Sequence, residues 1–496
     1  MKKPGTILYS LLITLIIGGC TITPAPLTRT ELDQQRTADL NKLFSNQEPI
    51  TGPIDLYEAM ARALMYNLDS RLKLMEEAVS RGQLEVLKYD LLPELTAEAG
   101  YSTRDNQPGA SSQSLLTGQI SLEPSKSIEK TYYDANLSMT WNILDFGVSY
   151  ARAEQQADRV LIMRERRRKV IQNIIQDVRY AYWRAVSAEE LLPRMDDMLA
   201  QAEDALEYSR QLESLRLQSP LTPLKYQKSL LDLVRKIWVL REDLSTAKIE
   251  LSTLINIRPG TTFQLADSGT ELISSATRLE TTSDELEQLA LLQRPELIEE
   301  NYKKRISALE VRKAMLSMFP SLNLIVGQNY QQNKFLFNDS WTSAGLGVSW
   351  NIMNLFSGPA RIRYAETQGE LDDMRRMALS MAVLSQVKLA YLRYHMAIKN
   401  NQILDRADDV ESRIMKHVIA GQRADREHAL DVLRVKTGAL LARMRQHVAH
   451  SEVENARGRL YNSVGYDPVP ENVPDHTIET LAKTIQERLK SLPTSM

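Results

Sequence analysis

The side chains best suited to chemistry in this sequence are two histidines near its C-terminal end. His447 and His450 lie three residues apart in a segment with helical periodicity, so both imidazoles could face one metal ion. The same positions flank an apolar helix seam at Ala449, which favours exposed or interhelical histidines over metal ligands. No carboxylate pair, nucleophile motif or phosphate-binding glycine loop stands out from the charged helical background. We therefore expect no catalytic residue, no metal site, no cofactor and no enzymatic activity.

A second candidate is a basic cluster, because residues 164–169 contain five basic side chains around Glu165. A solvated helix face is the simplest interpretation, and the alternative is a basic zone that interacts with anionic groups. The whole chain has 61 basic and 63 acidic side chains and a net charge of −2. Since phosphate binding needs a basic excess or a basic face, this balance gives no case for nucleic acid as a partner.

The single cysteine, Cys20, ends an N-terminal leader. Two lysines precede an apolar stretch from Ile7 to Ile17, which is too short for a bilayer-spanning helix of ~20 residues and is typical of a secretory signal peptide. The ending Ile17–Cys20 resembles a bacterial lipobox, which implies acylation of the thiol and cleavage before Cys20. Thr21, where an aspartate would retain the lipoprotein, implies sorting to the outer membrane. The alternative is an incidental cysteine beside an ordinary cleavage site.

Beyond the leader, the chain contains two copies of one unit. Residues 141–143 (Trp-Asn-Ile) recur at 350–352, and the same shift of 209 residues holds without a gap up to Pro468. A weaker match over the preceding segment places an insertion near residues 102–131 of the first copy. A period this long indicates a duplicated half-molecule, not a solenoid or propeller array.

Each copy contains segments in which apolar and polar residues alternate. Residues 134–142 and 343–352 have one apolar face and one face of polar residues or glycine. Segments of ~9–11 residues suit tilted transmembrane strands with an apolar face toward lipid, although a half-buried soluble sheet gives the same pattern. Four strands cannot close a barrel, and open edges in hydrocarbon leave backbone groups unpaired. The membrane interpretation therefore requires further copies; three would supply twelve strands, and strand count alone also permits a dimer.

A long helical hairpin follows the strands in each copy. In the first copy, apolar seams with steps of three and four residues run from Ile171 to Leu206 and from Leu230 to Leu254, separated by a break with two prolines. A helix from residue 148 to about residue 210 would be roughly 95 Å long, so it must project far from the membrane. Pro193 is expected to kink or interrupt this helix.

The order of these features resembles the outer membrane factor family typified by TolC, over nearly the whole mature chain. The segments that carry the resemblance are Trp350-Asn351-Ile352 leading into Arg361-Ile362-Arg363, Val387–Tyr391, Gly421 with Leu430–Leu433, Ala456 with Leu460 and Gly465, and Arg294–Leu297. The resemblance implies a mainly α fold with a membrane β-barrel. Duplicated helical hairpins would form a trimeric α-barrel, and four strands per chain would give a twelve-stranded trimeric β-barrel.

The resemblance also implies partners and a gate. A homotrimer in outer membrane lipid would dock, through its hairpin tips, a periplasmic adaptor protein and an inner-membrane transporter. The tip, docking and gate candidates in this sequence are Ser219, Thr222, Gly421, Asp425 and Asp431. We therefore expect a passive exit duct of a tripartite efflux or type I secretion system. The alternatives are a periplasmic coiled-coil scaffold or adaptor lipoprotein without a pore and, third, a hydrolytic enzyme.

These observations divide the chain into six expected parts. They are the signal peptide (1–19), a lipidated extended segment (20–52), the first repeat (53–260, with strands 94–104 and 131–143 and hairpin 148–256), an inter-repeat segment (261–282), the second repeat (283–468, with strands 320–331 and 341–352 and hairpin 360–465) and a C-terminal tail (469–496). We expect the lipidated segment to run along the outside and the tail to be partly mobile.

Overall fold

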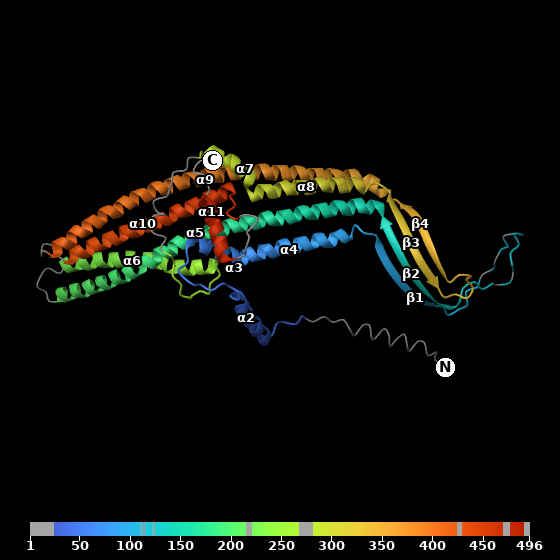
Figure 1. Cartoon of the computed structure of the whole chain (residues 1–496), viewed down its shortest axis with the longest axis horizontal. Coiled ribbons are helices and arrows are strands. Elements are labelled where there is room, and N and C mark those ends of the chain that lie inside the picture. The colour runs from blue at the N-terminus through green and yellow to red at the C-terminus, as the bar shows by residue number, and fades with distance from the viewer. Residues whose placement is uncertain are drawn as a thin grey trace.

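The chain folds into a long helical body with a four-stranded sheet at one end (Figure 1). The computed structural model describes residues 24–109, 111, 113–114, 116–121, 123, 125–214, 221–266, 281–423, 429–469 and 477–490. The elements are α2 (Arg29–Leu43), α3 (Leu56–Tyr66), α4 (Leu68–Tyr89), β1 (Glu94–Thr103), β2 (Thr131–Asn142), α5 (Ile143–Ser214), α6 (Leu221–Leu254), α7 (Ser283–Gln293), α8 (Pro295–Leu316), β3 (Ser321–Gln331), β4 (Ser340–Ser349), α9 (Met353–Arg423), α10 (Ala429–Val464) and α11 (Ile478–Lys490).

The two repeats have the same element order, and their longest helices organise the body. α5 has 72 residues and α9 has 71, so each is more than ~100 Å long. Toward the sheet, the helices lie in the order α4, α5, α8, α9; toward the opposite end the order is α6, α5, α10, α9. α5 thus has neighbours on both sides along its length, whereas α9 forms an edge of both rows.

The repeated Trp-Asn-Ile motif forms the junction from strand to helix. The side-chain oxygen of Asn142 accepts hydrogen bonds from the backbone N–H groups of Leu144 (3.1 Å) and Asp145 (2.9 Å). Asn351 accepts one from the N–H of Met353 at 3.1 Å. Asparagine is a preferred helix cap because its side chain satisfies the free amides of the first turn. The motif therefore fixes where each long helix begins.

The sheet has the strand order β1-β2-β3-β4, and every pairing is antiparallel. β2 and β3 come from different repeats, so the central pairing joins the two halves of the chain. Between β1 and β2, the described residues of the insertion form isolated bridges, such as that from Gln113 to Ile120, and no further strand. The insertion is therefore a connection between strands and does not extend them.

The main hydrophobic core lies where α5 packs against α3 and α6, and α11 joins it through its contact with α3. Tyr182 is fully buried, and its hydroxyl donates to the carbonyl oxygens of Ile54 (3.2 Å) and Ala266 (3.0 Å). Small side chains at Ala181 and Ala185 of the predicted seam are also buried. Because alanine adds little width, neighbouring helices can pack close to α5 along this seam.

The structure places a helix in each terminal segment. The segment 20–52 is not extended throughout, because α2 occupies Arg29–Leu43 and begins with a capping box formed by Thr28 and Glu31. The tail 469–496 contains α11, which packs against α3 through Ile478, Leu481 and Ile485.

The expected interruption at Pro193 is also absent, because α5 continues as one helix through this residue. Pro193 itself is exposed, whereas Leu191 and Met195 on either side of it are fully buried. We attribute the continuity of the helix to this packing, which compensates for the backbone hydrogen bond that proline cannot donate.

Candidate functional site

One face of the sheet is apolar across all four strands. Directly paired residues share a face in an antiparallel sheet, and the register places Leu95, Met139, Val326 and Ala344 in one row. Among the described residues this face has little cover: Leu95 is 68% exposed, and every residue of β4 is exposed. An uncovered apolar surface that extends over four strands indicates contact with lipid or with another protein.

Aromatic side chains lie at both ends of the apolar face. At the end far from the helices, the rings of Tyr101 and Tyr133 pair across strands with centroids 5.2 Å apart. At the helix end, Trp141 packs edge-on against Phe146 at 6.2 Å. Tyr133 and Trp141 are separated by about 26 Å along β2. A tilted transmembrane strand has about 9–11 residues, and outer membrane barrels have aromatic belts at both membrane surfaces, so the residues from Tyr133 to Trp141 have the length and the borders of such a strand.

The opposite face of the sheet is polar. The register places Glu98 beside Asn136 and Gly100 beside Asp134 on this face. A Cβ atom at Gly100 would lie only 2.8 Å from the Asp134 carboxylate oxygens, so glycine leaves room for the acidic side chain. A polar face behind a lipid-facing one is the arrangement expected for a strand that lines a water-filled lumen.

The helical body also has an uncovered apolar surface, along α9. Its members are large side chains that are 51–70% exposed, and we call them the α9 stripe: Met374, Met381, Leu392, Met396 and Ile403. The stripe lies on the edge helix of both rows. Both the sheet and the helical body thus end in apolar or unpaired edges.

The residues predicted for the hairpin tips lie at the end of the molecule opposite the sheet or outside the described residues. Gly421 lies in the last turn of α9, Thr222 in the first turn of α6 and Asp431 in the first turn of α10. Figure 1 places these helix ends close together. Ser219 and Asp425 lie outside the described residues.

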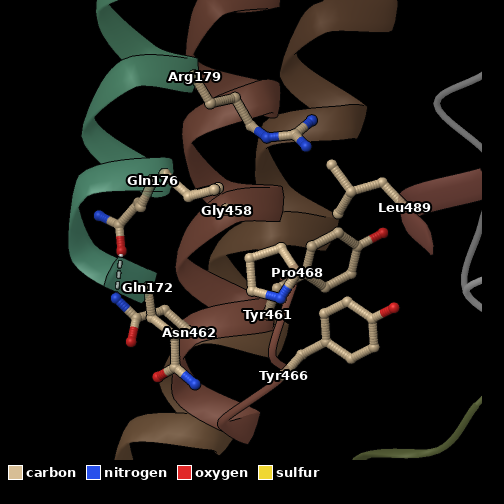
Figure 2. A pocket seen from close by; sticks show the side chains of 10 residues that line it. Gln172, Gln176, Arg179, Gly458, Tyr461, Asn462, Tyr466, Pro468 and Leu489 are labelled. Carbon is tan, nitrogen blue, oxygen red and sulfur yellow. Dashed lines mark hydrogen bonds between the residues drawn. The ribbon is translucent and has the colours of Figure 1, made fainter. Parts of the chain in front are cut away.

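A buried ion pair connects the two hairpins near the middle of the molecule. Arg179 of α5 lies 2.7 Å from Glu454 of α10, and both side chains are almost inaccessible. Burial alone would raise the pKa of Glu454, but the guanidinium groups of Arg457 and Arg179 hold that pKa below its usual value. Figure 2 shows Gly458 of α10 facing Gln176 of α5, and an added Cβ at Gly458 would lie 3.2 Å from the Gln176 side chain. Sequence reasoning missed this contact because its members lie far apart in the chain.

A family model for outer membrane efflux proteins matches residues 67–256 and 286–466. The chain belongs to the outer membrane efflux protein family. The two matched segments fall within the two predicted repeats, and the predicted membership of a TolC-like outer membrane family is confirmed. The chain is therefore an outer membrane efflux channel protein and not an enzyme, and the hydrolase alternative is wrong.

Solved outer membrane channels have the same fold as this outer membrane efflux protein. The open state of the Neisseria gonorrhoeae MtrE channel is 18% identical, with a TM-score of 0.64 over 83% of this chain and 88% of that chain. The Campylobacter jejuni CmeC channel is 14% identical, with a TM-score of 0.63 over 96% of this chain and 98% of that chain. Vibrio cholerae VceC is 13% identical, with a TM-score of 0.59 over 83% of this chain and 96% of that chain. No curated protein matches the chain by sequence.

In this efflux protein the basic cluster at 164–169 forms ion pairs with neighbouring helices. Arg166 pairs with Glu299 of α8 at 2.7 Å, and Arg167 pairs with Glu77 of α4 at 3.1 Å. These partners lie on the two helices that flank α5. The expectation of a simple solvated face is therefore wrong, because the cluster faces acidic side chains of both neighbours.

The predicted interhelical position of the two histidines is confirmed. His447 lies 3.2 Å from Glu190 of α5, and His450 packs edge-on against the Trp183 ring at 4.7 Å. Burial lowers the pKa of both imidazoles, and Glu190 and Glu454 only partly oppose this effect. The described residues contain no cluster of three or more side chains that could hold a metal ion.

Two features of the N-terminal prediction remain untested. Cys20 and the leader lie outside the described residues. Among the helices of the described segments, none combines the length and the apolar character needed to cross a membrane.

Proposed function

We propose that three copies of the chain close into one duct, with a twelve-stranded β-barrel in the outer membrane and a helical tunnel in the periplasm. The observation that supports it is that the sheet ends in two open edges, β1 and β4, beside an uncovered apolar face. Unpaired backbone groups in hydrocarbon cost several kcal/mol each. Pairing β4 of each copy with β1 of the next removes every open edge.

The width of the lumen determines how many copies are needed. Two copies would give eight strands, and a barrel of about eight strands has an interior that its own side chains fill. Twelve strands leave a water-filled passage. Small residues on the polar face, such as Gly345 and Gly347 of β4, add to this space.

The internal duplication indicates how neighbouring copies meet. Within the chain, α10 packs on α5 where His450 contacts Trp183. The equivalent residues, 209 positions away, are Leu392 in the α9 stripe and Arg241 on α6. Leu392 is 51% exposed, and Trp238, which packs under Arg241 at 5.1 Å, is 50% exposed. We propose that α6 of one copy packs on the α9 stripe of the next as α10 packs on α5.

The proposed trimer is an exit duct of a tripartite efflux or type I secretion system. Its hairpin tips lie farthest from the sheet, so they are the part that can reach a periplasmic adaptor and an inner-membrane transporter. Ser219, Thr222, Gly421, Asp425 and Asp431 are the proposed docking and gate residues. Asp425→Asn and Asp431→Asn are expected to raise the resting conductance, whereas an unchanged conductance in both variants contradicts a gate at these positions.

Cys20 is the proposed lipidation site. Acylated Cys20 would add a lipid anchor to the barrel, since one acyl chain alone binds a membrane only marginally. Cys20→Ala is expected to retain its leader and to lack acyl chains by mass spectrometry. A variant that is processed and acylated like the wild type would contradict this assignment.

Conductance in planar bilayers tests the duct. Purified full-length trimers are expected to give stable, water-filled single channels. A periplasmic scaffold lipoprotein would give none, and it would stay soluble without detergent once its acyl group is removed. That outcome would overturn the proposed function.

A further inference from the structure

An open cavity lies where the end of α10 meets the beginning of α8, between α5 and α9. Its volume is about 230 Å³. Four basic side chains and one acidic side chain contribute to its lining: Lys169, Arg294, Arg393, Arg459 and Glu452. The basic members come from four different elements, so the helix arrangement creates a positive cavity that no single sequence segment contains. We call this place the second-repeat corner.

Two of the four basic side chains already have counter-ions. Glu296 lies 3.0 Å from Lys169 and 2.8 Å from Arg294. Arg393 and Arg459, in contrast, form no ion pair with any described residue. Glu452 accepts a hydrogen bond from Asn455 at 3.3 Å and stays the only acidic side chain of the lining.

Asp177 of α5 is a further acid that interacts with Arg459, and it lies outside the lining. Burial raises the pKa of Asp177, and the charge of Arg459 opposes this only in part. Even with Glu296 and Asp177 counted as ionised beside Glu452, the four basic side chains outnumber the three acidic ones, so the cavity keeps a positive excess.

In the first repeat, the arginine that corresponds to Arg393 has two acidic partners, and the counterpart of the α5 wall, on α9, does not pack beside it. The residues that correspond to Arg393, Glu452 and Arg459 are Arg184, Asp243 and Glu250. Arg184 lies 3.0 Å from Asp243 and 2.6 Å from Glu250. The replacement of a glutamate by Arg459 removes one counter-ion and adds a second guanidinium, so these three side chains change from a net negative to a net positive charge.

Both repeats have the same kind of hydrogen bond between the start of one helix and the end of another. The side-chain amide of Asn67, just before α4, donates to the carbonyl of Leu254 at 3.0 Å. Arg294, just before α8, donates to the carbonyl of Ser463, the equivalent residue, at 3.2 Å. The start of α4 is thus bonded to the end of α6, as the start of α8 is to the end of α10.

We infer that the second-repeat corner binds an amphiphilic organic anion. Guanidinium groups match carboxylate, sulfonate and phosphate oxygens with paired hydrogen bonds, and Arg393 and Arg459 are available for this. Leu389, Ala390 and Ala456 add an apolar part to the lining. A cavity of this volume accommodates an aromatic ring system with one anionic group better than a bare inorganic ion.

The short helix α7 packs on α9 beside the cavity. α7 packs on the face of α9 that carries Val383 and Val387. At about 100° per residue, Gln386 and Arg393 lie on a different face of α9. The corner is formed within one chain, so the binding site does not depend on the proposed trimer.

Binding of naphthalene-1-sulfonate to the full-length protein in a non-ionic detergent tests the inference by isothermal titration calorimetry. We expect one molecule per chain. Arg459→Glu, which copies the first repeat, is expected to weaken binding at least about tenfold, because a charge-assisted hydrogen bond is lost and a repulsive charge is added. Inorganic sulfate, without the apolar contacts, is expected to bind about tenfold more weakly than the sulfonate.

The first repeat supplies the matched control. Glu250→Arg is expected to leave the stoichiometry at one per chain, because the first repeat has Asn67 in place of Arg294 and the counterpart of the α5 wall, on α9, does not pack beside α6. If Arg459→Glu fails to fold, as judged by its thermal unfolding, Arg393→Gln provides the same test. Unchanged binding in the folded variant overturns the site, and equal binding of sulfate overturns the amphiphilic ligand. Loss of channel conductance with binding retained would count against the duct alone.

Discussion

α5 and α9 are equivalent helices of the two repeats, yet their equivalent faces have opposite character. On α5, this face holds side chains that are only 4–7% exposed: Glu165, Gln172, Trp183 and Ser187. The residues 209 positions later on α9 are 51–70% exposed: Met374, Met381, Leu392 and Met396. The helix with mostly polar residues at these positions is covered, and the helix with apolar residues is open.

The duplication gives both repeats the same long helix, but the place of that helix in the row of helices determines which of its faces are covered. α5 lies between other helices that cover this face; the Gln172 amide donates to the carbonyl of Gly465 at 3.1 Å, whereas the Trp183 indole N–H is buried without a hydrogen-bond partner among the described residues. α9 lies at the edge, where apolar side chains gain nothing from water. The exposure of the α9 stripe supports the proposed contact with a neighbouring copy.

The largest expected effect comes from placing a charge in the α9 stripe. Leu392→Asp is expected to abolish the trimer and its conductance, because an unpaired charge in an apolar interface costs several kcal/mol. Light scattering in detergent measures the oligomer, and planar bilayers measure the channel. Gln402→Asp, at an exposed position of the same helix outside the stripe, is the control and should leave both unchanged. A trimeric Leu392→Asp variant with normal conductance would show that the stripe is not an interface.

The second prediction concerns the covered side of the comparison. Glu454→Gln is expected to lower the free energy of unfolding by about 3 kcal/mol, because Arg179 then remains buried without its partner. Urea unfolding of the detergent-solubilised protein measures this. The equivalents of Arg179 and Glu454 on α9 and α6 are Lys388 and Ser245, so Ser245→Gln serves as a control with a small expected effect. A loss below about 1 kcal/mol in Glu454→Gln would mean that the pair does not stabilise the α5–α10 contact.

Sequence reasoning identified the local structure well, because local structure depends on short-range periodicity. The alternation over 134–142 lies within β2, and the mainly α fold with long hairpins is confirmed. Ile478, Leu481 and Ile485 have the spacing of a helix, which the structure shows as α11, although the sequence analysis predicts only a tail there.

Contacts between distant segments could not be read from the sequence. Arg166 and Glu299 are 133 positions apart, and their pairing depends on α8 lying beside α5. The same limit applies to the second-repeat corner, where Arg393 and Arg459 meet only because α9 and α10 are neighbours. A basic run in a sequence therefore does not distinguish a solvated face from a helix junction.

The third prediction sharpens the comparison at a single helix position. Gly458 of α10 lies against α5, whereas Ile249, the equivalent residue of α6, is 53% exposed. Gly458→Leu is expected to lower the free energy of unfolding by about 1–3 kcal/mol, because Gln176 and Arg179 would have to move. Urea unfolding measures this, and Ile249→Ala is the control with a smaller expected loss. A fully stable Gly458→Leu protein would show that α5 and α10 can separate without cost.

The smallest expected effect is a pH dependence at the start of α8. Burial by itself raises the pKa of Glu296, but hydrogen bonding from Arg294 and the charges of Lys169 and Arg294 outweigh it and lower that pKa to about 2. On α9, the counterpart of Lys169 is Ala378, so only the covered helix has this tie.

Because the folded-state pKa of Glu296 is lowered, its contribution to stability is present above about pH 4.5 and is lost as the pH falls toward 2. The side chain is 26% exposed, so solvent screening reduces the expected contribution to about 1–2 kcal/mol. The unfolding free energy of the wild type should therefore fall more steeply between pH 5 and pH 3 than that of Glu296→Gln. Other paired carboxylates titrate equally in both proteins, so the difference between the two slopes reports Glu296 alone. Identical slopes would mean that Lys169 and Arg294 do not hold this carboxylate ionised, and that the contact of α5 with α8 rests on the remaining ion pairs.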